Sequence, residues 1–159
     1  MTGNQPVDQG GEGEAVRKNE TTKERVDRLV AEGEMTAQAV ANAERVWKER
    51  LANGILMPTG DMATVTLSDL HHVIVDSRIL RKPERIERML KGIFEVRTSR
   101  LDRRLALTRW HEEHPLVGLV VLLDSNQLWT LHVVDDKRLR REQNKGTLLW
   151  RRLARIIHE

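Results

Sequence analysis

Four polar residues on two predicted strands, Glu95, Arg97, Thr130 and His132, are the best candidates for chemistry in this sequence. Alternate side chains of a strand point to the same face, so Glu95 shares a face with Arg97, and Thr130 shares one with His132. If both pairs lie on one open side of a sheet, they bring together a base, a cation, a hydroxyl and an imidazole. Such a set suits metal-independent cleavage of RNA by attack of the ribose 2′-OH.

Each of these residues has an expected role in that reaction. His132 and Glu95 share the acid and base steps, Arg97 stabilises the phosphate, and Thr130 orients the group beside it. The alternative is that a half-exposed antiparallel sheet carries polar residues on its solvent face by default. The nuclease hypothesis therefore requires that these side chains meet at one phosphate-sized cleft.

Two further groups of histidines lie outside the strands. His71 and His72 are adjacent on a predicted short helix, so they point about 100° apart and cannot chelate one metal ion as an i, i+4 pair could. One of them, for which we take His72, is expected to reach over the sheet edge into the site. His111 and His114 flank two glutamates in a predicted loop, which we interpret as a solvated turn. No metal site is expected.

The C-terminal part of the chain is strongly basic. Residues 137–159 hold eight basic and two acidic residues, whereas residues 1–35 hold eight acidic and five basic ones. Such asymmetry favours a polyanionic partner such as RNA. The candidate nucleic-acid-binding residues are Arg138, Arg140, Arg141 and Lys145. Three tryptophans, Trp110, Trp129 and Trp150, could stack on bases, although apolar neighbours favour their burial.

Several classes of chemistry have no support in the sequence. The chain has no cysteine, which excludes disulfides and thiolate sites. It has no phosphate-binding glycine-rich loop and no serine nucleophile elbow, and we expect no cofactor. No run approaches the roughly 20 apolar residues of a membrane span, and the first residues lack an apolar signal region. We therefore expect no membrane association and a cytoplasmic location.

The elements that must position the candidate residues form an α+β fold. Four antiparallel strands are predicted over residues 94–98, 105–110, 116–123 and 128–134, with Asp124-Ser-Asn126 as a tight turn. Two helices precede the sheet, one over 69–77 capped by Ser68 and one that begins at Pro83 and ends at Gly92. After the last strand, apolar residues from Leu148 to Ile157 predict a basic amphipathic helix.

Three regions are predicted along the chain. Residues 1–20 are expected to be a disordered tail. Residues 21–54 predict a helical hairpin, with a capping box at Thr21 and Glu24 and a second helix from Thr36 to the Asn53-Gly54 stop. Residues 55–66 predict a connector, and residues 64–159 the α+β domain. The hairpin could also bind a protein partner.

Three short segments carry a resemblance to a known family: Leu70-His-His-Val-Ile-Val-Asp76, Leu80-Arg-Lys-Pro-Glu-Arg-Ile86 and Leu128-Trp-Thr-Leu-His132. Together, residues 65–150 resemble the small ribonuclease superfamily that groups barnase, EndoU, the colicin tRNases and RelE. The resemblance is to versions attached to phage structural proteins and polymorphic toxins. It implies a metal-independent RNase with His, Arg, Glu and Ser/Thr residues in its site. Residue by residue, it reaches His71 or His72, Arg97, Thr130 and His132.

Three hypotheses follow for the function. The first is an endoribonuclease-like domain that cleaves RNA. The second is a non-catalytic module, either one that binds nucleic acid through the basic segment or an accessory component of a phage-like or secretion assembly. The latter role requires Val40, Trp47 and Leu51 to be exposed on the hairpin. The third is a protein-binding regulator whose acidic N-terminus masks the basic C-terminus.

Overall fold

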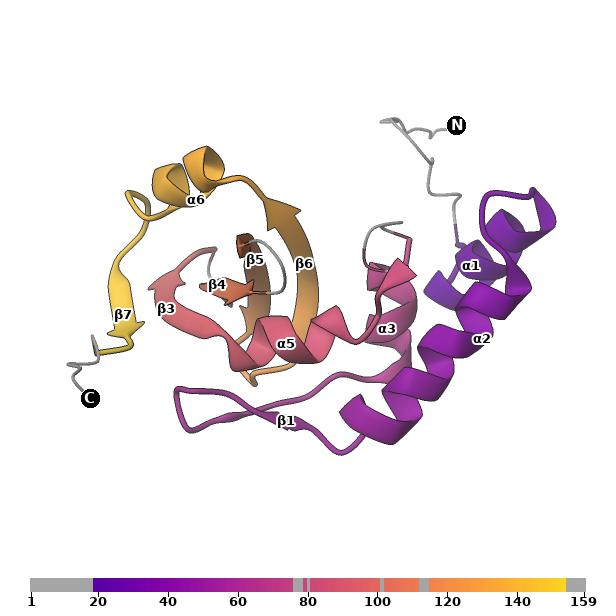
Figure 1. The fold of residues 1–159 in the computed structure, drawn as a ribbon, viewed down its shortest axis with the longest axis horizontal. Coiled ribbons are helices and arrows are strands. Elements are labelled where there is room, and N and C mark those ends of the chain that lie inside the picture. The colour runs from indigo at the N-terminus through magenta and orange to yellow at the C-terminus, as the bar shows by residue number, and fades with distance from the viewer. Residues whose placement is uncertain (1–18, 76–78, 80, 101, 112–114, 154–159) are drawn as a thin grey trace.

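The computed structural model describes residues 19–75, 79, 81–100, 102–111 and 115–153 of the chain (Figure 1). It is an α+β structure, as predicted, in which helices precede a curved antiparallel sheet. The predicted tail, residues 1–20, lies outside the described part except for its last two residues. No helix within the described ranges is both long and apolar enough to cross a membrane.

The sheet has five strands, of which four were predicted. They are β3 (Ile93–Thr98), β4 (Arg103–His111), β5 (Pro115–Leu123), β6 (Leu128–Val134) and β7 (Leu148–Arg151). Their order is β6-β5-β4-β3-β7, and all neighbours are antiparallel. The turn between β5 and β6 forms as expected, because Asn126 adopts a left-handed φ of 69° and its N–H donates to the Leu123 carbonyl.

The C-terminal segment corrects the sequence prediction. The basic helix α6 covers only Asp136–Glu142, and Leu148–Arg151 forms the fifth strand instead of continuing it. Gly146, at φ 64°, turns the chain against Thr98, and a side chain there would collide with the Thr98 carbonyl. The backbone of residue 147 then bonds Thr98, which begins the pairing of β7 with β3. Pairing with an open sheet edge overrides the local helical spacing of the leucines.

The N-terminal helices form where predicted. Helix α1 (Thr22–Ala31) has the predicted capping box: Thr21 Oγ1 accepts from the Glu24 amide, and the Glu24 carboxylate accepts from the Thr21 amide. Helix α2 (Ala37–Val46) is capped by Thr36 and continues as a π-helical turn, η2 (Trp47–Leu51). Figure 1 shows both helices at the end of the molecule opposite β7.

The segments between the N-terminal helices and the sheet differ in detail from the prediction. Residues 55–66 are more than a connector, since β1 (Ile55–Leu56) and β2 (Met62–Ala63) pair as a small hairpin. Helix α3 (Leu67–Val73) starts earlier than predicted, because Thr66 rather than Ser68 caps it and forms a capping box with Asp69. Helix α5 (Arg85–Lys91) starts two residues after Pro83 and ends at Gly92 as predicted.

One continuous core joins the N-terminal helices to the sheet. It contains buried side chains from α1, α2, α3, α5 and one face of the sheet, among them Val26, Val40, Leu70, Leu90, Val120 and Leu131. A smaller apolar cluster lies on the other face, where Leu139 of α6 packs with Leu107, Val117 and Leu119. Residues of both predicted structured regions thus share one core, while the division into a hairpin and a separate domain stays a prediction.

The apolar face that an assembly role would require to be exposed is covered. Leu51 is fully buried, Val40 is 8% exposed, and Trp47 is half-buried with its Nε1–H donating to the Val65 carbonyl at 2.8 Å. These three residues were the requirement for an assembly role of the N-terminal helices. They stabilise the fold instead.

Candidate functional site

The four candidate strand residues lie in two rows across one face of the sheet. The rows are Glu95–Leu107–Leu119–His132 and Arg97–Leu105–Val121–Thr130. Each row spans three strand spacings, or roughly 14 Å along the sheet. Leucine and valine side chains fill the middle of both rows. All four residues lie on one face of the sheet, as predicted. However, Glu95 and Arg97 lie at one side of an apolar patch, and Thr130 and His132 lie at the other.

Glu95 is buried and fully engaged. Its side chain is 1% exposed, and its Oε2 accepts from Arg97 Nη1 at 2.6 Å. Its Oε1 accepts from Arg151 Nε at 3.1 Å and from Gln143 Nε2 at 3.2 Å. A buried carboxylate is tolerated only when it is paired in this way. Glu95 therefore ties β7 and the end of α6 to β3, which suits an anchor better than a general base.

A bulge in β6 changes which side chains of that strand share a face. Val121 pairs with Thr130 but Leu122 pairs with Leu128, so Trp129 is the extra residue. Leu128 and Leu131 are consequently both buried, whereas Trp129 is 41% exposed. The strict alternation predicted for this strand, with Trp129 and Leu131 on one face, is wrong at this point. Nothing in the sequence marks the bulge.

A small cleft lies between α1, α3 and the bulge in β6. It is lined by Thr22, Ser68, Asp69, His72 and Trp129. The ring centroids of His72 and Trp129 are 6.0 Å apart, with the rings tilted by 43°. The Arg103 guanidinium carbon lies 4.3 Å from the centroid of the Trp129 ring. The cleft thus combines an imidazole and an exposed indole, and the cation Arg103 lies against the same indole without lining the cleft.

The protonation of His72 is set by its surroundings. Burial lowers the pKa of His72 below its usual value, the positive charge of Arg25 and that of His132 lower it further, and Asp69 partly opposes them. The effect of His132 places it within electrostatic reach of His72. At neutral pH His72 is therefore mainly the neutral imidazole, which can accept a proton.

The two adjacent histidines point to different sides, as predicted. His71 is buried, and its Nε2 lies 2.7 Å from Glu44 Oε2 on α2. His72 points instead into the cleft beside Trp129. His71 thus ties α3 to α2, and His72 alone is available to a ligand.

Sequence reasoning missed three residues that line this cleft, Thr22, Ser68 and Asp69, and two cations near it, Arg25 and Arg103. Thr22 Oγ1 and Ser68 Oγ lie 3.2 Å apart, so α1 forms part of the cleft wall. The N-terminal helices were expected only to pack or to bind a partner. Arg25 lies 47 residues before His72 in the sequence, so no local pattern indicates that it lowers the pKa of His72. That effect depends on tertiary packing.

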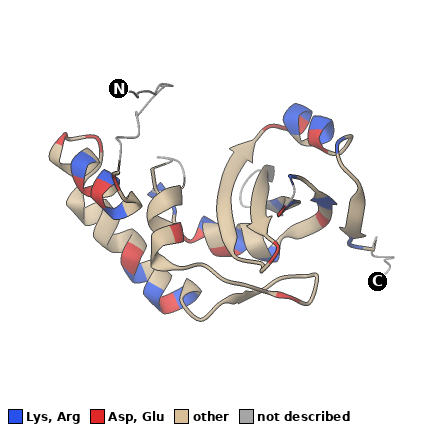
Figure 2. Cartoon of the chain, turned by 180° about the vertical axis from the view of Figure 1, so that it is seen from behind, with Lys and Arg blue, Asp and Glu red and all other residues tan. Residues whose placement is uncertain are grey.

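The predicted nucleic-acid-binding residues are exposed on and just after α6. Arg138, Arg140, Arg141 and Lys145 all face solvent. Glu142 pairs with Arg138 at 4.0 Å and with Lys145 at 3.3 Å, while Arg140 and Arg141 form no ion pair with any residue that the structure describes. Figure 2 shows basic and acidic residues close together on this helix, so the patch is mixed rather than purely basic.

The remaining candidates carry no site in the described part of the chain. Within those ranges no three His, Cys, Asp or Glu residues are grouped so that they could hold a metal ion. His114 and the side chains of His111 and Trp110 lie outside the described structure. Trp150 is half-buried and packs on the main core.

Comparison with known proteins gives no relative: no family model, no curated protein and no solved structure matches this chain. The resemblance to small ribonucleases stays a prediction from the sequence.

Proposed function

We propose that this protein is a metal-independent endoribonuclease whose site is the cleft between α3 and β6. The observation that supports it is the cleft itself, in which His72 lies against the exposed Trp129, with Arg103 beside that ring. His132, the strand candidate, is near enough to affect the charge of His72. Of the residues predicted from the sequence, His72 and His132 remain catalytic candidates in this proposal. Glu95 and Arg97 instead have a structural role, in which they link β7 and α6 to β3.

The reaction follows from the two histidines. Neutral His72 takes the proton from the ribose 2′-OH, and the 2′-oxygen attacks the adjacent phosphorus. The bond to the 5′-oxygen breaks, and protonated His132 donates a proton to that oxygen. The products are a 2′,3′-cyclic phosphate and a free 5′-OH. Arg103 stabilises the negative charge on the phosphate, and Trp129 stacks on a neighbouring base.

The test is cleavage of an end-labelled structured RNA by the full chain in excess EDTA. We expect cleavage that leaves a 2′,3′-cyclic phosphate, and we expect His132→Ala to lose it while circular dichroism shows that folding is kept. Glu34→Ala, which changes an exposed residue beyond α1, is the control and should cleave as the wild type does. Absence of cleavage by the wild type at every salt concentration would overturn the proposal.

The second candidate is a non-catalytic RNA-binding module, favoured by the exposed Arg140 and Arg141 on α6. Binding that weakens with salt, together with no cleavage, would select it. An accessory role in a larger assembly has less support, because the apolar residues it requires on α2 and η2 are covered. In either case we propose that the protein acts on RNA in the cytoplasm.

A further inference from the structure

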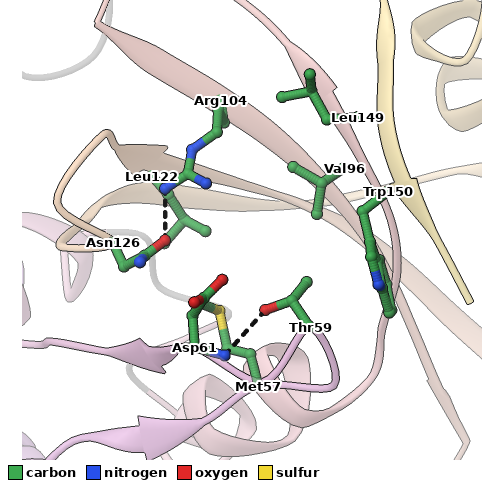
Figure 3. Close-up of a pocket in the computed structure, with 9 residues that line it drawn as sticks. All are labelled: Met57, Thr59, Asp61, Val96, Arg104, Leu122, Asn126, Leu149 and Trp150. Carbon is green, nitrogen blue, oxygen red and sulfur yellow. Dashed lines mark hydrogen bonds between the residues drawn. The ribbon is translucent and has the colours of Figure 1, made fainter.

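A second pocket lies between the β1–β2 hairpin and strands β3, β4, β5 and β7, and it shares no lining residue with the His72 cleft (Figure 3). Its cavity volume is about 180 Å³, and the pocket is partly open to solvent. That volume is smaller than the roughly 300–1,000 Å³ of drug-sized ligand sites, so the pocket would take a single ring system rather than a whole nucleotide. Its walls combine apolar side chains with one cation and one carboxylate, a composition typical of a site for a polar aromatic ligand.

The cation is Arg104 of β4, and its position is fixed. Its Nη2 donates to Asn126 Oδ1 and to the carbonyls of Leu123 and Asp124. In Figure 3 the other terminal nitrogen points away from Asn126 into the pocket, and no described residue accepts from it. A guanidinium held on one side by the β5–β6 turn thus presents free N–H groups to the pocket on the other.

The carboxylate is Asp61, on the loop between β1 and β2. Backbone bonds hold this loop, with the Met57 amide donating to the Asp61 carbonyl at 2.9 Å and the Gly60 amide to the Met57 carbonyl at 2.9 Å. Among the described residues the Asp61 side chain has no ion pair and no hydrogen bond, and it does not reach within 4.0 Å of Arg104. The two opposite charges therefore line one pocket without neutralising each other.

The walls suit a flat ring. Trp150 is seen edge-on at one side of the pocket in Figure 3, so one face of its indole is turned inward. Val96, Leu122 and Met57 provide the apolar remainder. A planar heterocycle that stacks on Trp150 would bring its hydrogen-bonding edges to Asp61 and Arg104.

We propose that this pocket binds a guanine base. Guanine has two donors, N1–H and the N2 amine, on the edge that a carboxylate recognises, and two acceptors, O6 and N7, on the edge that an arginine recognises. Adenine has a lone pair at N1, which a carboxylate repels, and an amine where guanine has O6. Cytosine and uracil offer less surface for stacking. The inference does not depend on cleavage at His72.

The test is calorimetric titration of the full chain with GMP, inosine monophosphate, AMP and CMP. We expect GMP to bind most tightly, inosine monophosphate less tightly because it lacks the N2 amine, and AMP and CMP weakly. Asp61→Ala should weaken GMP binding about tenfold or more without weakening AMP binding, since the repulsion of adenine N1 is removed. Glu34→Ala removes one exposed carboxylate elsewhere and should bind GMP as the wild type does.

Two further arms identify the source of the base and separate this inference from the nuclease proposal. Oligonucleotides of equal length with and without a single guanosine show whether the base is taken from RNA, from a free nucleotide or from both. His132→Ala should bind GMP normally, whether or not it cleaves RNA. Equal binding of all four nucleotides, no binding of GMP or of the guanosine oligonucleotide, or full GMP binding by Asp61→Ala would overturn the proposal.

Discussion

At the scale of single residues, the proposed site depends on the pKa of His72. Burial and the charge of Arg25 lower the pKa of His72, whereas the His132 side chain is exposed. The lowered pKa suits His72 to the role of base that we propose for it. The roles follow from the surroundings, because the sequence alone does not distinguish one histidine from the other.

The pKa of His72 gives a direct prediction. An NMR titration should show this pKa below about 6.5. Arg25→Gln should raise it more than His132→Ala does, because Arg25 contributes the larger effect, and Asp69→Asn should lower it. Below pH 6.5 the unfolded chain binds the proton that folded His72 does not, so the free energy of unfolding should fall as the pH drops to the folded pKa. A His72 pKa that is unchanged in Arg25→Gln would contradict this account.

At the scale of elements, Glu95 links three segments that are distant in sequence. It joins β3 to Arg151 of β7 and to Gln143 just after α6. Thr98 adds backbone and side-chain bonds to residue 147. The short strand β7 and the seven-residue α6 depend on these contacts, because neither is long enough to be stable alone.

Removal of the Glu95 carboxylate should therefore be costly. We expect Glu95→Ala to lower the free energy of unfolding by about 3 kcal/mol or more, since it leaves the largely covered Arg97 without its carboxylate partner and with only the Lys145 carbonyl. Glu87→Ala is the matched control, because Glu87 also contacts two cations, Arg50 and Lys91, but both are more than half exposed. That change should cost about 1 kcal/mol or less. Equal losses in chemical denaturation would show that Glu95 is not an anchor.

The elements also show what the sequence could and could not predict. Strands β3 to β6 follow from two-residue alternation and turn chemistry, and α1 follows from its capping box. Strand β7 does not, because Leu148, Leu149 and Leu153 fit a helical spacing equally well and only the open edge of β3 decides between the two. The bulge at Trp129 could not be predicted from the local sequence either, because it depends on how β6 pairs with β5.

At the scale of the whole molecule, the N-terminal helices contribute to the proposed site. They share one core with the sheet, and α1 provides Thr22 to the His72 cleft and Arg25 to its electrostatics. His72 and His132 were both found as candidates from the sequence. The sequence also placed Glu95 and Arg97 in the same site, and the structure separates these two from His132 by the apolar middle of the sheet.

The central claim is that catalysis takes place in the His72 cleft and not at Glu95 and Arg97. The most direct measurement compares single-turnover rates of RNA cleavage for His72→Ala and Glu95→Gln, each normalised to the fraction that is folded. We predict a loss of about 10²–10⁴-fold for His72→Ala, the range for removal of a general base, and a rate near that of the wild type for folded Glu95→Gln. A large loss in Glu95→Gln with full activity in His72→Ala would contradict the account and return the site to Glu95 and Arg97.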